Sequence, residues 1–271
     1  MTLLVVSFPC TIPVNQGLFS AIEGRTDWDI TIITPSNWTD GFGESKSVEK
    51  MEGFNGDREI KRIDPDAIYV HHEAYAIATF QVYLSNWLFF QKPIGFYSAQ
   101  NIPKEYPPPF CYFESFVYSQ SDFSFPITEK VLDVLRHKGY EGPATVLPLG
   151  IDEAVYHPRE KTALGESGES TDEILIGYVG RIVEMKGLET LIRALKRLEG
   201  LPWKLILIGR GPYESELERI SNSLSISDRV THIGYVPHSE VPTYLSSLDI
   251  LVLPSETQPD AEEQFGRVII E

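Results

Sequence analysis

The sequence predicts an α/β protein with two domains, each built on a parallel β-sheet. Short, continuously apolar runs alternate with amphipathic segments along the chain, which is typical of parallel strands covered on both faces by helices. The length of 271 residues suits two domains of ordinary size. A polar, Gly/Ser-rich stretch without periodicity separates the two series of runs. We therefore expect an N-terminal domain over residues 1–160, a linker over 161–172 and a C-terminal domain over 173–271.

The expected strands follow directly from the apolar runs. In the first half they are LLVVSF from Leu3, ITIIT from Ile30, AIYV from Ala67, PIGFY from Pro93 and ATVLPL from Ala144. In the second half they are ILIGYVG from Ile174, KLILIG from Lys204, RVTHIG from Arg229 and DILVLPS from Asp249. Strands that recur at such short intervals imply βαβ units with parallel pairing.

Two helices have clear signals. Apolar residues between Lys186 and Leu198 fall on one helical face, and Gly200 with Pro202 ends that helix before the next strand. Thr128 stands where a helix cap is expected, at the start of ITEKVLDVLRHKGY.

Composition excludes several classes of partner. The net charge of -16 repels nucleic acid and anionic lipid at long range, so only a local basic site could hold an anion. Cys10 and Cys111 give neither a disulfide framework nor metal-ligand spacing, which favours a reducing compartment. No apolar stretch approaches the roughly 18 residues of a membrane span. We expect a cytoplasmic protein, with peripheral attachment at the inner face of the membrane as an alternative.

Charged and glycine residues gather where strands of the second half end, which is where open α/β sheets bind their ligands. In VGRIVEMKG, Gly180 allows a phosphate to approach the backbone, and Arg181 and Lys186 supply cations. The alternative is that both are solvated loop charges. In LILIGRGPYESEL, Glu214 replaces the third glycine of a dinucleotide fingerprint, which disfavours a dehydrogenase and indicates a tight strand-to-helix turn.

Two further stretches lie at the same expected edge. The loop at Tyr235 and Val236, in HIGYVPHSE, is suited to touching a nucleotide base. In EQFGRVIIE, we expect a helix that begins near Phe265 and directs its positive N-terminal dipole at an anion. Glu271 would then lie inside that helix, two turns beyond Glu263.

Together with LPLGIDEAVYHP from Leu147, these stretches in this order resemble the group 1 glycosyltransferases, retaining enzymes of the GT-B class. The resemblance implies two Rossmann-like domains that face a cleft, and a nucleotide-diphosphate sugar as co-substrate, without a cofactor or a bound metal. It also implies a glycan or a lipid-linked acceptor. By the same resemblance, Arg181, Lys186 and the backbone at Phe265 and Gly266 would bind the donor diphosphate. Glu263 would contact the sugar hydroxyls as a catalytic residue, and Glu271 would bind the ribose. The loop at Tyr235 and Val236 would contact the base.

The first half carries the catalytic and acceptor-side expectations. AIYVHHEAY resembles the family's loop after the fourth strand, and its His72 would lie beside the anomeric carbon as a catalytic residue. Val70 stands where the family often has an earlier His. YSAQNIPKEYPPPF resembles a family variant that places Gln100 and Asn101 on the acceptor side, although both could be turn-forming polar residues. Gly17 would match a family glycine near the acceptor and the sugar.

Other interpretations remain beside this one. The D-x-D triplets at Asp27 and Asp64 invite a metal-dependent mechanism, but both lead into apolar strands at the wrong end of a sheet, so we expect turn or strand-entry residues. The family pattern continues past Glu271, which implies an incomplete C-terminal domain, an exposed apolar edge at DILVLP, poor solubility and weak activity. An inactive or nucleotide-binding-only fragment, and a sugar epimerase or phosphorylase with two Rossmann-like domains, are the alternative functions.

Overall fold

The structure is a computed structural model, and it describes residues 1–35, 48–51, 56–160, 173–259 and 261–271. Its internal contacts divide the chain into two compact units, Met1–Gly150 and Ile151–Glu271. The expected linker over residues 161–172 lies outside the described residues. In the part of the chain that is described, no helix has the length and apolar character needed to cross a membrane.

The first unit is built on a parallel sheet of six strands in the order β3-β2-β1-β4-β5-β6, which is the strand order of a Rossmann fold. The strands are β1 (Thr2–Ser7), β2 (Asp29–Pro35), β3 (Val48–Met51), β4 (Ala67–His71), β5 (Ile94–Ser98) and β6 (Phe123–Pro126). The helices are α1 (Gly17–Glu23), α2 (Gly56–Ile63), α3 (Ile77–Ser85), α4 (Phe110–Gln120) and α5 (Glu129–His137), with short turns η1 (Pro9–Thr11), η2 (Pro13–Gln16) and the π-helical η3 (Asn86–Phe90).

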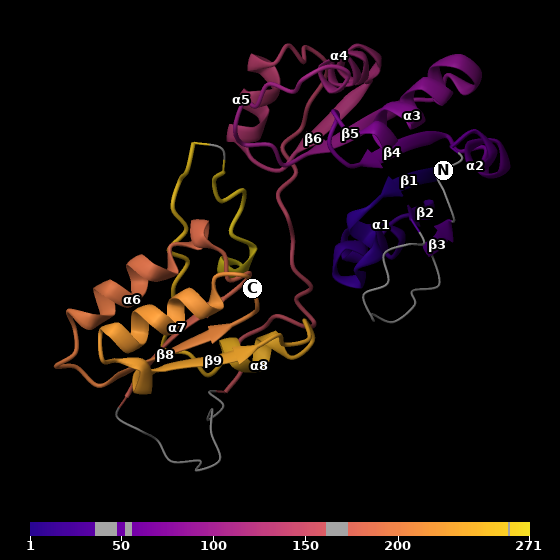
Figure 1. Cartoon of the computed structure of the whole chain (residues 1–271). Helices are drawn as coiled ribbons and strands as arrows, with labels where there is room; N and C mark the ends of the chain where they lie inside the picture. Colours follow the sequence, from indigo (N-terminus) through magenta and orange to yellow (C-terminus); the bar gives the residue numbers. More distant parts are fainter. Residues whose placement is uncertain (36–47, 52–55, 161–172, 260) are drawn as a thin grey trace. The chain divides into compact units, whose positions relative to one another are not determined.

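Both faces of this sheet are covered, which explains why its strands are continuously apolar (Figure 1). Leu4 and Val6 of β1 point to the face packed by α2, α3, α4 and α5. Leu3 and Val5 point to the opposite face, where Phe19 of α1 packs. Thr128 caps α5 as predicted, because its side chain accepts a hydrogen bond from the amide of Val131 at 3.2 Å.

The second unit is also a parallel sheet, of four strands in the order β10-β7-β8-β9. Its strands are β7 (Ile174–Val179), β8 (Trp203–Ile208), β9 (Val230–Gly234) and β10 (Ile250–Leu251). Its helices are α6 (Leu188–Lys196), α7 (Glu214–Ser223) and α8 (Val241–Leu245), with 3-10 turns η4 (Glu184–Lys186), η5 (Ser227–Arg229) and η6 (Arg267–Ile269).

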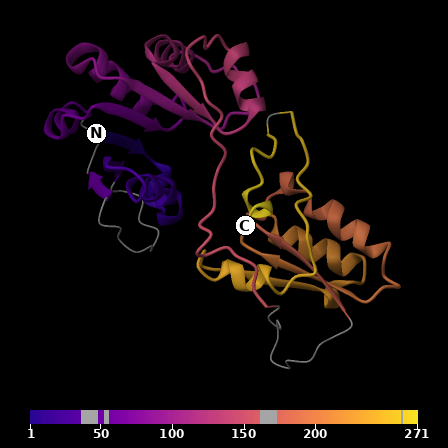
Figure 2. The ribbon, with the colours of Figure 1, turned by 180° about the vertical axis from the view of Figure 1, so that it is seen from behind.

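Helices α6 and α7 cover one face of the second sheet, as Figure 2 shows from behind. The predicted apolar face of α6 is buried there, with Leu188, Ile192 and Leu195 in one core cluster. The other face is covered by α8 and by the segment that precedes β7, from which Tyr156 enters the core. Strand β10 forms one edge of the sheet, and its Ile250 is 48% exposed.

Two predicted elements differ from the observed ones, and two observed strands were not predicted. The run from Ala144 is not a strand. The amides of Thr145 and Leu147 donate to carbonyls of β6, but Pro126 has no N–H that could donate to this run, so only an isolated bridge at Ala144 forms. Strands β3 and β6 were not predicted, because the sequence VEKM is polar and FSFP is short. The helix expected near Phe265 is only the three-residue turn η6.

Candidate functional site

The loops after β7, β8 and β9 meet at the carboxyl edge of the second sheet and are tied together through their backbones. The amide of Ile182 donates to the carbonyl of Arg210 at 2.9 Å, and the amide of Gly209 donates to the carbonyl of Gly234 at 2.8 Å. Gly209 has a φ of +131°, and a Cβ there would lie 1.9 Å from the carbonyl oxygen of Gly180. As predicted for the LILIGRG stretch, its glycines serve close backbone packing.

Lys186 and Glu263 meet at this edge, although they are 77 residues apart. The Lys186 ammonium donates a hydrogen bond to Glu263 Oε2, and the Ser255 hydroxyl donates to the same oxygen at 2.7 Å. Burial alone would raise the pKa of Glu263, but the hydrogen bonds from Lys186 and Ser255 outweigh it and lower that pKa. The Lys186 side chain is 14% exposed and that of Glu263 is 27% exposed, so both are reachable from solvent.

A glycine explains how Lys186 reaches this position. Gly187 has a φ of +64°, and a Cβ there would lie 2.0 Å from the carbonyl oxygen of Pro254. The turn η4 is therefore pressed against the segment that follows β10, which carries Ser255. Ser255 was not among the predicted site residues, although its place directly after the run DILVLP was the signal for it.

Arg181 lies in the same region. Its side chain is exposed and has no hydrogen-bond or ion-pair partner among the described residues, while its carbonyl accepts a hydrogen bond from the Tyr178 hydroxyl at 2.8 Å. The pKa of Tyr178 is raised by burial and by the charge of Glu263, and it is lowered by the charge of Arg181. Because both charges act on one hydroxyl, the structure brings Arg181 into the neighbourhood of Glu263 and Lys186.

Glu271 lies apart from an open ligand surface. Its side chain is only 7% exposed and forms an ion pair with Arg267 at 3.0 Å, and His238 Nε2 lies 3.9 Å from the same oxygen. His238 in turn contacts the Tyr156 hydroxyl at 2.9 Å. Burial raises the pKa of Glu271, and Arg267 only partly offsets this effect.

The other predicted donor-side residues have mixed environments. Tyr235 is 57% exposed, whereas Val236 is buried in the core with Tyr156. Gly266 is left-handed, with a φ of +70°, and its amide bonds to Glu263. Among the described residues, the left-handed Gly266 and the three-residue turn η6 stand where the helix was expected.

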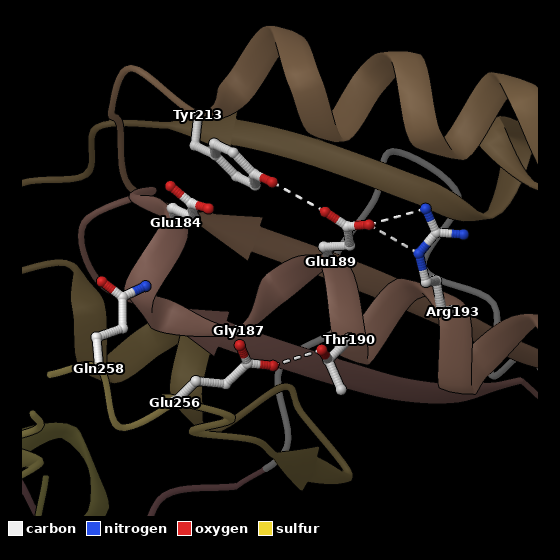
Figure 3. Close-up of a pocket in the computed structure, with 8 residues that line it drawn as sticks. All are labelled: Glu184, Gly187, Glu189, Thr190, Arg193, Tyr213, Glu256 and Gln258. Carbon is white, nitrogen blue, oxygen red and sulfur yellow. Dashed lines mark hydrogen bonds and ion pairs between the residues drawn. The ribbon is translucent and has the colours of Figure 1, made fainter.

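A small hollow of about 150 Å³ lies beside this site, over the start of α6 (Figure 3). Figure 3 shows Glu184, Glu189 and Glu256 around it. Its one arginine, Arg193, is paired with Glu189 at 2.8 Å. This lining is anionic, and the volume is below the roughly 300 Å³ of ordinary ligand pockets. The hollow is therefore unsuited to a diphosphate.

In the first unit, His72 follows β4 and is half-buried. Its ring packs against Phe8 at 4.7 Å between centroids, and its Nδ1 is buried without a hydrogen-bond partner among the described residues. Burial lowers the pKa of His72, so the imidazole is neutral at pH 7. The neighbouring His71 is more deeply buried, which lowers its pKa to about 4.

The predicted acceptor-side residues follow β5, the strand that pairs with β4. Gln100 is 8% exposed and Asn101 is 6% exposed. The Gln100 Nε2 is buried and has no hydrogen-bond partner in the described part of the chain. Gly17 is the first residue of α1, is exposed, and has open space where a Cβ would stand, so nothing in the structure requires glycine there.

The D-x-D triplet at Asp64 has structural partners for both of its carboxylates. Asp66 accepts a hydrogen bond from the amide of Thr2 at 2.8 Å, which ties the entries of β1 and β4. Asp64 pairs with Lys92 at 2.7 Å. Among the described residues there is no group of three or more His, Cys, Asp or Glu side chains placed to hold a metal ion.

Two α/β units on parallel sheets, with cations at the carboxyl edge of the second, define a protein of the GT-B class. Comparison with known proteins then gives an assignment for one segment: residues 160–271 match the model described as glycosyl transferases group 1.

Sequence relatives agree with this assignment. The alpha-D-kanosaminyltransferase of Streptomyces kanamyceticus is 34% identical over 102 residues, which cover 37% of this chain and 25% of the relative. The matched segment thus spans a quarter of that relative's length.

Two solved structures share the fold. The structure of Anabaena Alr3699/HepE in complex with UDP matches with a TM-score of 0.74 at 16% identity, over 99% of this chain and 76% of that one. Sucrose-phosphate synthase from Thermosynechococcus elongatus matches with a TM-score of 0.72 at 16% identity, over 99% and 77%.

Proposed function

We propose that this chain transfers a sugar, with retained configuration, from a nucleotide-diphosphate sugar to a glycan or a lipid-linked acceptor. The observation that carries the proposal is the junction of Lys186, Glu263 and Arg181 at one sheet edge, within the segment that matches the group 1 glycosyl transferases. The names of the sequence relatives support transfer of a sugar.

The charge distribution supports a diphosphate as the ligand of this edge. The protein as a whole is acidic, with a net charge of -16, so an anion needs a local cation to bind. Arg181 offers a guanidinium that no described residue engages, and Lys186 is bonded to Glu263, whose charge acts with that of Arg181 on the Tyr178 hydroxyl. One structure of the same fold was solved in complex with UDP, which makes UDP the first ligand to test.

The proposed reaction uses the residues that the resemblance to the group 1 glycosyltransferases indicates. The bond between the anomeric carbon and the diphosphate oxygen breaks, and Arg181 with Lys186 stabilises the charge that develops on the leaving group. The acceptor oxygen attacks on the same face, and its proton passes to the leaving phosphate. Glu263 accepts hydrogen bonds from the sugar hydroxyls, and the resemblance to the group 1 glycosyltransferases assigns the neutral imidazole of His72 to the reacting sugar.

We further propose that this chemistry needs no cofactor and no resident metal, and that the protein works in the cytoplasm, with peripheral membrane attachment when the acceptor carries a lipid. Both cysteines are free thiols, which supports a reducing compartment.

The test begins with binding. Isothermal titration with UDP, GDP, ADP and dTDP identifies the nucleotide, and the corresponding sugars are then tried as donors. We expect one diphosphate to bind, its sugar to be consumed with release of the diphosphate, and NMR of the product to show the donor's anomeric configuration. Absence of binding by all four nucleotides would refute the proposal, and an inverted product would refute the retaining mechanism.

A further inference from the structure

Glu73, the residue after His72, ties two loops of the first unit together. Its Oε1 accepts a hydrogen bond from the amide of Ala99 at 2.7 Å, and its Oε2 accepts one from the Ser98 hydroxyl at 2.9 Å. The Ser98 hydroxyl accepts in turn from the amide of Gln100 at 3.3 Å. One carboxylate therefore holds the end of β5 at Ser98 and the backbone of Ala99 directly, and it holds the Gln100 amide through the Ser98 hydroxyl.

The backbone of Glu73 is itself anchored. Its carbonyl accepts hydrogen bonds from the Thr79 hydroxyl at 2.8 Å and from the amide of Ala76 at 3.2 Å. The loop after β4 is thus held at the start of α3, and it can act as a fixed support for the loop after β5.

The environment of Glu73 is unfavourable for an ionised carboxylate. Burial raises the pKa of Glu73 to about 7, against the lowering effect of the hydrogen bonds from Ala99 and Ser98. The other charges that act on it are Glu114 and Lys138, which are bonded to each other at 2.6 Å. Buried polar groups of this kind cost free energy, so their retention indicates a positional requirement.

A second contact holds the far end of the same loop. Tyr106 stacks on Tyr75 with 4.0 Å between ring centroids, and the Lys138 ammonium lies 4.6 Å from the centre of the Tyr106 ring. The segment between Ser98 and Tyr106 is therefore attached at both ends to the loop that carries His72 and Glu73.

Within this segment, Gln100 is buried, and its side-chain nitrogen is unsatisfied in the part of the chain that the structure describes. Its side chain is 8% exposed, yet Nε2 has no partner among the described residues, and the same holds for the buried Nδ1 of His72. Buried nitrogens are normally hydrogen-bonded, so two unpartnered ones at the ends of adjacent strands indicate groups that a ligand completes. A hydroxyl suits both, because it can accept from the amide and donate to the imidazole.

We propose that Glu73 is a positioning residue: it holds Ser98, Ala99 and Gln100 so that the Gln100 carboxamide, beside the loop that carries His72, binds a hydroxyl of a polyhydroxylated acceptor. This inference rests on the proposed function for its kinetic consequence. Glu73 acts by hydrogen-bond geometry and not by charge. The carboxamide introduced by the substitution Glu73→Gln can accept from Ala99 and donate to Ser98, so it preserves the arrangement.

The experiment compares Glu73→Ala, Glu73→Gln and the control Glu59→Ala in the whole protein. Glu59 is a matched control because it is also a buried glutamate of the first unit, and it pairs with Arg62 on its own helix. The donor is the nucleotide sugar selected by titration, and methyl glycosides serve as acceptor probes. Hydrogen exchange of the Ala99 amide provides a readout that does not depend on transfer.

We expect Glu73→Ala to lower kcat/KM for the acceptor by about tenfold or more and to leave the donor KM unchanged, because a hydrogen-bonded position is lost. Ala99 exchange should accelerate by a similar factor. Glu73→Gln and Glu59→Ala should resemble the wild type in both measurements.

Unchanged Ala99 exchange in Glu73→Ala, or failure of Glu73→Gln to restore acceptor kinetics, would overturn the inference. An equal rise of donor and acceptor KM would also overturn it, since it would indicate general loss of structure. Absence of transfer by the wild type would refute the proposed function, and the Ala99 exchange rates would then decide the positioning role.

Discussion

Replacing Lys186 or Arg181 by Met separates the structural role of a cation from its binding role. Lys186 is bonded to the half-buried Glu263, whereas Arg181 has no partner among the described residues. Loss of Lys186 therefore leaves a half-buried carboxylate without its cation, although it still accepts hydrogen bonds from Ser255 and the Gly266 amide. Loss of the Arg181 side chain leaves no carboxylate among the described residues without its ion-pair partner.

The expected losses of folding stability follow from how exposed the paired side chains are. Breaking a fully buried ion pair costs about 3 to 5 kcal/mol, and an exposed pair is worth about 0 to 1 kcal/mol. With side chains 14% and 27% exposed, the pair of Lys186 and Glu263 lies between these limits, so we expect Lys186→Met to destabilise the second unit by about 2 kcal/mol. For Arg181→Met we expect less than about 0.5 kcal/mol.

The pair should also depend on pH in a defined direction. The pKa of Glu263 is lowered in the folded state from the ordinary value of 4.5, so the stabilisation is present above pH 4.5 and is lost as the pH falls through the lower folded pKa. The difference between Lys186→Met and the wild type should therefore be complete at neutral pH and should vanish in strong acid.

Urea denaturation followed by fluorescence at several pH values measures these differences, and titration with UDP measures binding. Each variant should lose about 1.5 to 3 kcal/mol of UDP affinity, or roughly 10- to 150-fold, because each removes one charge-assisted contact. Equal destabilisation by the two variants would refute the structural argument. Undiminished UDP binding by either variant would refute its assignment to the diphosphate.

Three other outcomes are expected. Thr128→Ala should cost about 1 kcal/mol in urea denaturation through loss of the cap, and a neutral result would count against that hydrogen bond. The pKa of Glu73 rises from 4.5 in the unfolded chain to about 7 in the folded protein, so the wild type loses stability as the pH rises between these values. Glu73→Gln should therefore be more stable than the wild type by up to about 3 kcal/mol at pH 8 and equally stable near pH 4. A difference that does not change with pH would contradict this reasoning. Gly209→Ala should lower the thermal midpoint strongly, because its Cβ would overlap the Gly180 carbonyl. The control Gly200→Ala should change the midpoint little, because the space around its Cβ is open. Equal midpoints of the two variants would disprove the packing argument.

Strand positions could be predicted because both sheets are covered on two faces, so most of their strands are largely continuous apolar runs. The same criterion missed β3 and β6, which are edge strands with polar or alternating sequences, and it wrongly included the run from Ala144. Edge strands carry a weaker pattern because one side has no neighbour to exclude water.

The site was predictable only in part. The positions of Arg181 and Lys186 follow from their places after a strand, because parallel strands bring their carboxyl ends to one edge. The contact between Lys186 and Glu263 could not be derived, since no local pattern relates residues 77 positions apart. The role of Glu73 was hidden for the same reason: its partners Ser98 and Ala99 are 25 and 26 residues away.

The glycines at the carboxyl edge of the second sheet have a consequence for protein engineering. Main-chain bonds join the loops after β7, β8 and β9, and two exposed arginines, Arg181 and Arg210, project from this platform without contributing side-chain bonds to it among the described residues. Grafting a foreign loop onto one strand would displace the neighbouring loops. Substitution of the two arginines would leave these main-chain bonds intact, so the side chains at both positions can be varied at little risk to folding.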